Sequence, residues 1–482
     1  MSTYIKGVGR GQMSFDFMSL DAMVDENSAV RAIDAIVDML NATKCSFVHA
    51  QPNETGRPSH DPVKMFKLYV YCYFEKIRSS RNIEKECTRN IEVMWLMDKI
   101  VPDHKCIANF RKDNKKAIKA AFAEFVEICD ALGLLGKSMV AIDGSKFRAN
   151  NARKQNVTLG KLGKKIEHFQ RLVEEYNREL DVNDEKLSAA ETKIEEAQNM
   201  VDMMKNADIT EISLTDPDSR LMGLANGGYE VGYNVQNAVD SKAHIIVITD
   251  VVMTPADQGQ LYKMAHEVTE ILQSEDENPL TVLADKGYFE GHDIQKCEDD
   301  PKISAIVSRP AEKGNDGFKK SQFTYNAEND SYTCPVGQIL HRTGNKKLTY
   351  ENNRACKGCQ FHEQCTKRAR GRVITRNNFE EAMEAGAARF EQNKALYRER
   401  QKIVEHPFGT VKRTLGFTYF LTRGVENVKA ENQLHMLTYN IKRVLNLFSV
   451  PDFMRALQKL RGVRQGNSFV FARFDTFILL FY

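Results

Sequence analysis

The chain has 482 residues, 42% hydrophobic and 28% charged, which suits a protein with about two to four packed domains. Its formal net charge is only +3, which excludes a polycation and means that any nucleic-acid surface must be local. We find no secretory signal and no apolar run of the roughly 20 residues that cross a bilayer. We therefore expect a cytoplasmic protein without membrane contact, in which clustered cysteines favour metal over disulfides.

The first 135 residues predict a bundle of helices. Apolar residues recur at helical spacing from Ala29 to Leu40, and Pro62 suits the first turn of a following helix. The segment NIEKECTRNIEVMWL predicts another helix. Short helices joined by polar turns fit a helix-turn-helix, but a structural bundle that helps to assemble a dimer has the same pattern. We expect residues 1–135 to form a helical DNA-binding or assembly domain.

Strand patterns begin at Ser138. The run SMVAID predicts a buried strand that ends at Asp143, where Asp-Gly marks a turn. Apolar residues then recur every three or four positions from Leu162 to Met204, with turn-forming residues at 181–184. This pattern predicts an antiparallel helical hairpin inserted at 158–206.

The chain then continues as a mixed α/β sheet. A hairpin signal joins GYNVQNAVD to AHIIVITDVV, and TPAD caps a predicted helix from Gln258 to Leu272. TVLAD and residues 303–308 predict two more strands, and helices return from Asn378 to Lys412 and from Glu431 to Phe448. The apolar C-terminal segment FVFARFDTFILLFY favours a buried strand. We expect an α/β core made of two segments, 136–310 and 377–450, with a cysteine-rich insertion at 311–376 between them and a tail at 451–482.

Three acidic motifs carry the candidate chemistry: Asp143 in AIDGSKFRAN, Asp285 in VLADKGYFEG, and Glu405 in YRERQKIVEHPFGTVKR. Carboxylates from separate elements are what two divalent ions about 4 Å apart around one phosphate require. Taken singly, each Asp is equally a turn residue, and Glu405 is equally an exposed helical side chain. The prediction rests on their combination.

Cations accompany each acidic residue. Lys146 follows Asp143, Lys286 follows Asp285, and Lys412 comes seven residues after Glu405, two helical turns along the same face. Such cations beside a phosphate stabilise the charge of a transition state, although they are also ordinary surface residues.

A cysteine cluster is a separate signal. Four cysteines lie within thirty-two residues, and one pair has CxxC spacing: Cys334, Cys356, Cys359 and Cys365. This set suits a tetrahedral structural zinc site, in which His362 could replace one thiolate. Reduced cysteines in a small loop domain are the alternative.

These motifs resemble the DDE transposases of bacterial insertion sequences, in the group with a Tyr–Arg–Glu–Lys signature. GRPSHDPVKMFKLYVYCY resembles the N-terminal transposase domain of that group. AIDGSKFRAN, ADKGYF and VEHPFGTVKR resemble the blocks that carry the three catalytic acids, and the cysteine insertion resembles one found in a subset of these enzymes. The family spaces its signature as Tyr, two residues, Arg, three residues, Glu, six residues, Lys. Here four residues separate Arg400 from Glu405.

The resemblance implies an RNase H-like α/β core in which Asp143, Asp285 and Glu405 hold two Mg²⁺ ions. One ion would activate water for strand cleavage at the element's end, and the released 3′-hydroxyl would attack target DNA. Five residues are expected to contact DNA: Lys412, Arg400, Tyr397, Lys286 and Lys146. The N-terminal domain would recognise terminal inverted repeats, and a homodimer would hold both ends.

Two alternatives remain open on the sequence. A metal-dependent nuclease on the same fold would cut without rejoining, with the same carboxylates. A catalytically inactive, DNA-binding descendant is the other alternative. The presence of all three acidic residues favours an enzyme.

Overall fold

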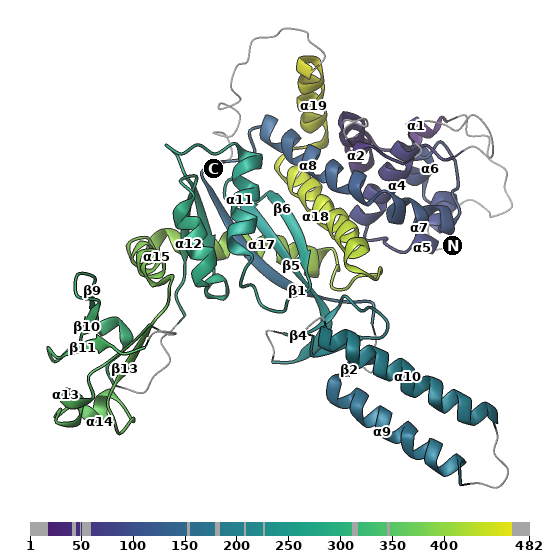
Figure 1. Cartoon of the computed structure of the whole chain (residues 1–482). Helices are drawn as coiled ribbons and strands as arrows, with labels where there is room; N and C mark the ends of the chain where they lie inside the picture. Colours follow the sequence, from purple (N-terminus) through teal and green to yellow (C-terminus); the bar gives the residue numbers. More distant parts are fainter. Residues whose placement is uncertain are drawn as a thin grey trace, which may run out of the picture. The chain divides into compact units, whose positions relative to one another are not determined.

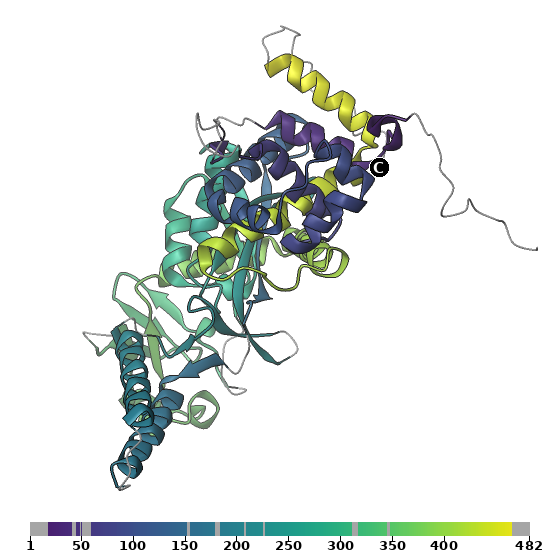
Figure 2. The ribbon, with the colours of Figure 1, turned by 90° about the vertical axis from the view of Figure 1, so that its right-hand side faces the viewer.

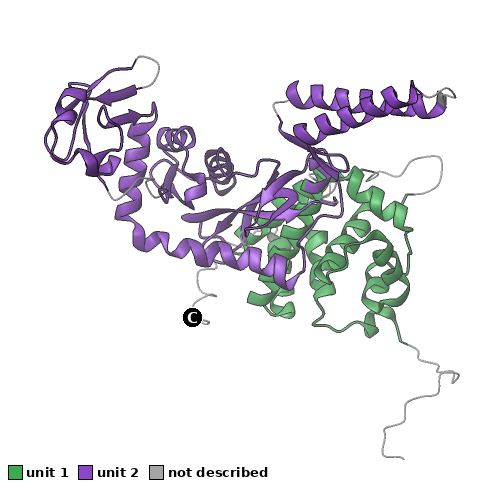
Figure 3. Ribbon diagram, turned by 90° about the horizontal axis from the view of Figure 1, so that it is seen from below, with its two compact units in different colours: residues 1–132, 429–482 green, residues 133–428 purple. Residues whose placement is uncertain are grey.

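The computed structural model divides into two compact units, residues 1–132 with 429–482 and residues 133–428 (Figure 3). It describes residues 18–464 except 41–44, 49, 51–58, 152–154, 179–183, 207–208, 225–226, 311–316 and 345–347. The expected boundary at 450 differs from this division, because residues 429–450 group with the N-terminal helices. The C-terminal segment FVFARFDTFILLFY lies outside the described residues.

The first unit is helical, as the sequence predicts. Its helices are α1 (Leu20–Met23), α2 (Ala29–Met39), α4 (Pro62–Phe74), α5 (Ser80–Arg89), α6 (Ile91–Leu96), α7 (His104–Asp113), α8 (Lys115–Ala131), most of α18 (Val425–Leu447) and α19 (Val450–Arg464). The single helix expected across NIEKECTRNIEVMWL is wrong. Asn90 breaks it, because its side chain accepts from the amides of Glu92 and Val93 and so caps α6. None of the helices described has the length and apolarity to cross a membrane.

The second unit contains a mixed six-stranded sheet. Its strands are β1 (Met139–Arg148), β4 (Arg220–Gly223), β5 (Tyr229–Asp240), β6 (Ile246–Val252), β7 (Leu280–Ala284) and β8 (Ile303–Val307). The strand order is β4-β5-β1-β7-β8, and β6 also pairs with β5. The predicted hairpin is confirmed as the antiparallel pair β5–β6, while β7 and β8 run parallel to β1 (Figure 1).

Strand β1 does not end at Asp143, contrary to the expected Asp-Gly turn. It continues to Arg148, because β5 pairs with it from Val140 to Arg148. Only the parallel partner stops early, since the last pair with β7 is Ile142 with Ala284. Asp143 therefore lies inside a strand, at the position where that strand loses one of its two neighbours.

Helix α11 (Leu261–Leu272) begins three residues later than predicted. Its N-cap is Gln260, which makes no side-chain capping bond, so the expected cap at Thr254–Asp257 is wrong. The side chain of Asp257 is instead bonded to groups on β1 and β5.

The predicted helical hairpin is confirmed. Helices α9 (Leu159–Tyr176) and α10 (Asp184–Asn206) lie side by side in both views (Figures 1 and 2). The short strands β2 (Asn156–Thr158) and β3 (Glu211–Ser213) pair at the base of the hairpin. Most of the predicted turn, residues 181–183, lies outside the described residues.

The cysteine-bearing segment is more ordered than the loop-rich pattern suggested. It forms a five-stranded antiparallel sheet from β9 (Thr324–Asn326), β10 (Ser331–Thr333), β11 (Ile339–Arg342), β12 (Leu348–Glu351) and β13 (Val373–Arg376). Two short helices, α13 (Asn353–Lys357) and α14 (His362–Cys365), connect β12 to β13. A small core is buried on this sheet: Phe323, Tyr332, Leu340, Tyr350 and Ile374.

Four helical segments follow this sheet. They are α15 (Glu380–Gln392), α16 (Lys394–Tyr397), α17 (Glu399–Gly409) and a π-helical turn at Thr410–Thr414. Helix α17 packs against β1, which brings this stretch of the chain to the central strand of the sheet.

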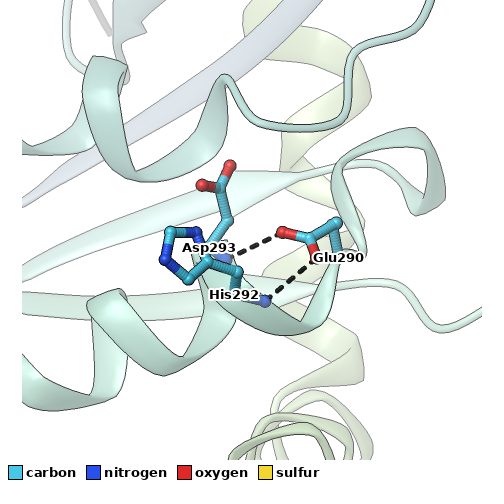
Figure 4. Close-up of side chains that lie close together, drawn as sticks. All are labelled: Glu290, His292 and Asp293. Atoms are coloured by element: carbon cyan, nitrogen blue, oxygen red, sulfur yellow. Dashed lines mark hydrogen bonds between the residues drawn. The ribbon is translucent and has the colours of Figure 1, made fainter. Parts of the chain in front are cut away.

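Helix α12 (Gly291–Asp299) begins with an acidic cap. Glu290 accepts hydrogen bonds from the amides of His292 and Asp293 (Figure 4). Asp293 in turn accepts one from the amide of Leu261. Among the described residues, Glu290, His292 and Asp293 are the one group of three possible ligands whose atoms lie within 4.8 Å of one another. Both carboxylates already accept backbone hydrogen bonds, so the group is explained as a helix cap.

Replacing Glu290 by Ala is expected to lower the free energy of unfolding by about 1 kcal/mol, because two amides of the first turn lose their acceptor. Thermal unfolding should show the same loss with and without added Mg²⁺. His292→Ala is the control and should change stability less, because the imidazole caps nothing. Stabilisation of the wild type by Mg²⁺ that His292→Ala abolishes would instead identify a metal site.

Candidate active site

Two of the three predicted acidic residues lie side by side. Ile142 on β1 and Ala284 on β7 form the last parallel pair. Asp143 is the next residue on β1, and Asp285 is the first residue after β7. Asp285 turns its chain at once, since its Oδ1 accepts from the amide of Gly287 at 2.7 Å. The sheet thus delivers two carboxylates from segments 142 residues apart to one edge, as expected at the carboxyl ends of parallel strands.

The carboxyl group of Asp143 is in an unfavourable place for a negative charge. Burial raises its pKa to about 6, the guanidinium of Arg400 opposes that rise, and the negative charges of Asp285 and Asp257 add to it. A carboxylate that is short of compensating positive charge is a natural ligand for a divalent cation.

A cationic group reaches Asp143 from α17. Arg400 Nη1 lies 3.5 Å from Asp143 Oδ1. This nitrogen is buried and has no hydrogen-bond partner among the described residues. Tyr397 packs edge-on against Phe390 and lies 5.9 Å from the Arg400 guanidinium, so it supports that side chain. Arg400 therefore presents, beside Asp143, a donor nitrogen that makes no hydrogen bond within the described residues.

A second cation lies on the same face of β1. Side chains alternate along a strand, so Asp143, Ser145 and Phe147 share one face. Lys412 Nζ donates to Ser145 Oγ and to the carbonyl of Lys146, both at 2.7 Å, and lies 4.4 Å from the centre of the Phe147 ring. Burial lowers its pKa to about 8, with a further lowering from Lys146 and an opposing rise from Asp143. Lys412 sits in the π-helical turn, so α17 does not carry it along the face of Glu405 as the sequence suggested.

The third predicted acid is not gathered with the other two. Glu405 is exposed on α17, and its Oε1 accepts from Gln401 Nε2 at 2.7 Å. Asp143, Asp285 and Glu405 do not form a group whose ligand atoms all lie within 4.8 Å. Lys286 is exposed next to Asp285.

The structure adds Asp257, which the sequence reasoning missed. Its Oδ1 accepts from Asn234 Nδ2 at 2.7 Å, from Gln236 Nε2 at 2.8 Å and from Lys146 Nζ at 3.2 Å. Lys146 is thus paired with an acid on the face of β1 opposite to Asp143. One signal was available in the strand pattern GYNVQNAVD, because its amide side chains Asn234 and Gln236, two positions apart on one face of a strand, need a buried polar partner.

The four predicted zinc ligands line one small cavity in the cysteine-bearing segment. Cys334, Cys356, Cys359 and Cys365 share it with His362, whose Nε2 is buried without a hydrogen-bond partner among the described residues. The donor set therefore suits zinc. No three of these sulfur atoms lie within 4.8 Å of one another, which is looser than a tetrahedral Zn–S site with bonds of about 2.3 Å.

Two family models match segments of the chain. "Transposase domain (DUF772)" matches residues 18–113, and "Transposase DDE domain" matches residues 333–445. The second match contains Arg400, Glu405, Lys412 and all four cysteines of the cavity. Asp143 and Asp285 lie outside both matches, which together span less than half of the chain.

A search of the curated proteins found no match to the chain. Among solved structures, a cryo-EM structure of the piggyBac transposase synaptic complex with hairpin DNA is 9% identical. That comparison covers 91% of this chain and 80% of the other with a TM-score of 0.32, and a likeness so distant carries no argument. The argument comes from the two domain matches: the chain is an enzyme with the function of a DDE transposase.

Proposed function

We propose that this transposase cuts DNA strands at the ends of a bacterial insertion sequence and joins them to target DNA. The observation that carries the proposal is the adjacency of Asp143 and Asp285 at the ends of the parallel pairing of β1 and β7, with the Arg400 donor nitrogen beside Asp143. Paired acids with adjacent cations suit chemistry on a phosphodiester, where charge develops on phosphate oxygens.

The proposed core is RNase H-like. Three features support it: the antiparallel run of β6, β5 and β1, the parallel strands β7 and β8 on the other side of β1, and the helices α11 and α12 between the later strands. Asp143 on β1 and Asp285 directly after β7 would supply two of the three acids.

In this proposal Asp143, Asp285 and Glu405 hold two Mg²⁺ ions. When bound, these ions would activate water and the 3′-hydroxyl and stabilise the charge that develops on the phosphate. The raised pKa of Asp143, caused first by burial, supports a cation site there. The proposal requires the side chain of Glu405 to turn from Gln401 toward the aspartates.

The cations around the acids would bind DNA phosphates. Arg400 has a buried donor nitrogen without a hydrogen-bond partner in the described part of the chain, and Tyr397 would hold its guanidinium in place. Lys412 stands beside the acids on the same face of β1, and Lys286 is exposed next to Asp285. Lys146 would have to leave Asp257 before it could contact DNA.

The remaining assignments of the proposal concern partners and the second metal. The helical residues 1–135 would recognise terminal inverted repeats, and two copies would hold both ends, in the cytoplasm. A structural Zn²⁺ would bind Cys334, Cys356, Cys359 and Cys365. The shared cavity supports this, and so does His362 Nε2, which is buried and has no hydrogen-bond partner among the residues that the structure describes. Metal binding would draw the sulfur atoms closer together.

We expect Asp143→Asn, Asp285→Asn and Glu405→Gln each to abolish Mg²⁺-dependent cleavage while folding and DNA binding persist, because each removes one anionic ligand. The measurement is cleavage of a labelled duplex that carries the ends of the element encoding this chain. Glu399→Gln, which removes another carboxylate of α17, is the matched control and should cleave normally. Retained cleavage in any of the three variants would remove that residue from the site.

The same assay with a pre-cut end separates the proposal from its alternatives. Joining of that end to a second duplex supports a transposase, whereas cleavage without joining indicates a nuclease. Binding without either reaction indicates an inactive descendant.

Arg400→Gln should weaken binding to the same duplex and reduce the slope of log affinity against log salt concentration by about 1, because one phosphate contact is lost. Arg398→Gln removes an exposed arginine beside the start of α17 and serves as the control. An unchanged slope for Arg400→Gln would exclude a phosphate contact.

Changing Cys356 and Cys359 together to Ser should remove one zinc per chain and increase proteolysis within residues 330–370, since the remaining donors cannot complete a tetrahedral site. Elemental analysis and limited proteolysis measure both effects. Cys106→Ser, at a half-buried cysteine in α7, should retain the zinc. A wild-type protein without zinc would contradict the assignment.

A further inference from the structure

Asp257 is the one residue that faces inward in an otherwise exposed loop. Residues 253–259 follow β6, and within this stretch every residue except Asp257 is exposed. Asp257 does not cap α11, so helix formation does not explain its inward orientation. The inward orientation of its carboxylate must therefore come from the side chains to which it is hydrogen-bonded.

Those groups form a buried polar network on the rear face of β1, opposite to Asp143. Oδ1 of Asp257 accepts from Asn234, Gln236 and Lys146, and Oε1 of Gln236 accepts from the hydroxyl of Tyr288. Asn234, Gln236 and Tyr288 are fully buried. Each buried amide without an acceptor would cost about 1–3 kcal/mol of folding free energy. Asp257 stabilises the sheet because it supplies the acceptor for Asn234 and Gln236.

The network touches both segments that carry the catalytic aspartates. A Cβ on Gly144, the residue after Asp143, would lie 2.5 Å from Asp257 Oδ1 and 2.5 Å from Gln236 Nε2. A Cβ on Gly287 would lie 2.9 Å from Asp285 Oδ1 and 3.4 Å from Asp257 Oδ2. The carboxylate of Asp257 thus occupies space that only glycine leaves open behind β1, and it lies at van der Waals distance from the turn after β7.

Tyr288 extends the link to the second aspartate. It ends the short 3₁₀ turn Lys286–Tyr288, which Asp285 caps through the amide of Gly287. Its hydroxyl bonds to Gln236, which also bonds to Asp257. A shift of Asp257 would therefore be transmitted to Gly144 by contact and to the Asp285 turn through Gln236 and Tyr288.

We propose that Asp257 is a positioning residue for this transposase, which fixes the backbone of Asp143 and Asp285 from behind through Gly144, Gln236 and Tyr288. The proposal rests on the proposed function of Asp143 and Asp285. Asp257 has no contact with DNA in this role, and its carboxylate is paired with Lys146 in the structure. Groups that orient metal-binding carboxylates matter because small misplacements of the reacting groups lower the rate strongly.

The test compares Asp257→Ala and Asp257→Asn with the wild type, using the labelled end duplex. We expect Asp257→Ala to lower the unfolding midpoint, because the buried amides of Asn234 and Gln236 lose their acceptor. The folded variant should cleave roughly 10- to 100-fold more slowly at saturating DNA, with DNA affinity close to wild type. Asp257→Asn keeps one acceptor oxygen for the two amides and should recover part of that rate. Hydrogen exchange should increase selectively in residues 143–147 and 285–289.

Two further variants keep the test decisive. Asp300→Asn is the matched control, since Asp300 also accepts side-chain hydrogen bonds in this unit but has no contact with the site, and it should cleave normally. Tyr288→Phe removes one hydroxyl from the network and should give a smaller loss of the same kind, even where Asp257→Ala does not fold.

Cleavage at the wild-type rate by both Asp257 variants and by Tyr288→Phe would overturn the proposal. A loss of cleavage that only follows the loss of folded protein, or that comes with an equal loss of DNA affinity, would also overturn it, because that pattern belongs to a residue that only maintains the fold. Asp143→Asn, measured in the same assay, distinguishes a failure of the proposed role of Asp257 from a failure of the proposed function. An inactive Asp143→Asn with normal Asp257 variants refutes only the role of Asp257, whereas an active Asp143→Asn refutes the proposed function itself.

Discussion

The site depends on how β1 is paired. Its antiparallel partner β5 runs along it to Arg148, while its parallel partner β7 stops at the pair Ile142–Ala284. Asp143 is consequently held in a regular strand by β5 but has no pairing partner on β7. Asp285, the first residue after β7, lies beside it. A shift of one residue in this register would move Asp143 to the rear face and separate it from Arg400.

The alternation of side chains along β1 divides the charged groups into two sets. On the front face, Asp143 meets Arg400 and Ser145 meets Lys412, and neither cation is fully neutralised. On the rear face, Asp257 and Lys146 pair with each other and with two buried amides. The front set has capacity for a ligand. In the rear set the donor groups of Asn234, Gln236 and Lys146 are taken up by Asp257, so this set supports the strand.

The cysteine-bearing segment has a different physical basis. Its five strands enclose a core with Tyr332 and Tyr350 at van der Waals distance, their ring centres 5.0 Å apart. The cysteines lie mainly outside those strands, on the connection formed by α13 and α14. A metal in their cavity would therefore stabilise the connection between β12 and β13 more than the sheet itself.

The sequence by itself determined the helical hairpin, the β5–β6 pair, the buried strands β7 and β8, and the candidate acids Asp143 and Asp285. Periodicity and turn residues encode these features locally. Only the tertiary structure decided that β1 continues beyond Asp143, that Asn90 divides a predicted helix, and that Asp257 turns toward β5 instead of capping α11. The same holds for Lys146 and Lys412, whose partners lie more than a hundred residues away in the chain. Such contacts follow from strand pairing and burial across the whole unit, and a local sequence pattern therefore cannot predict them.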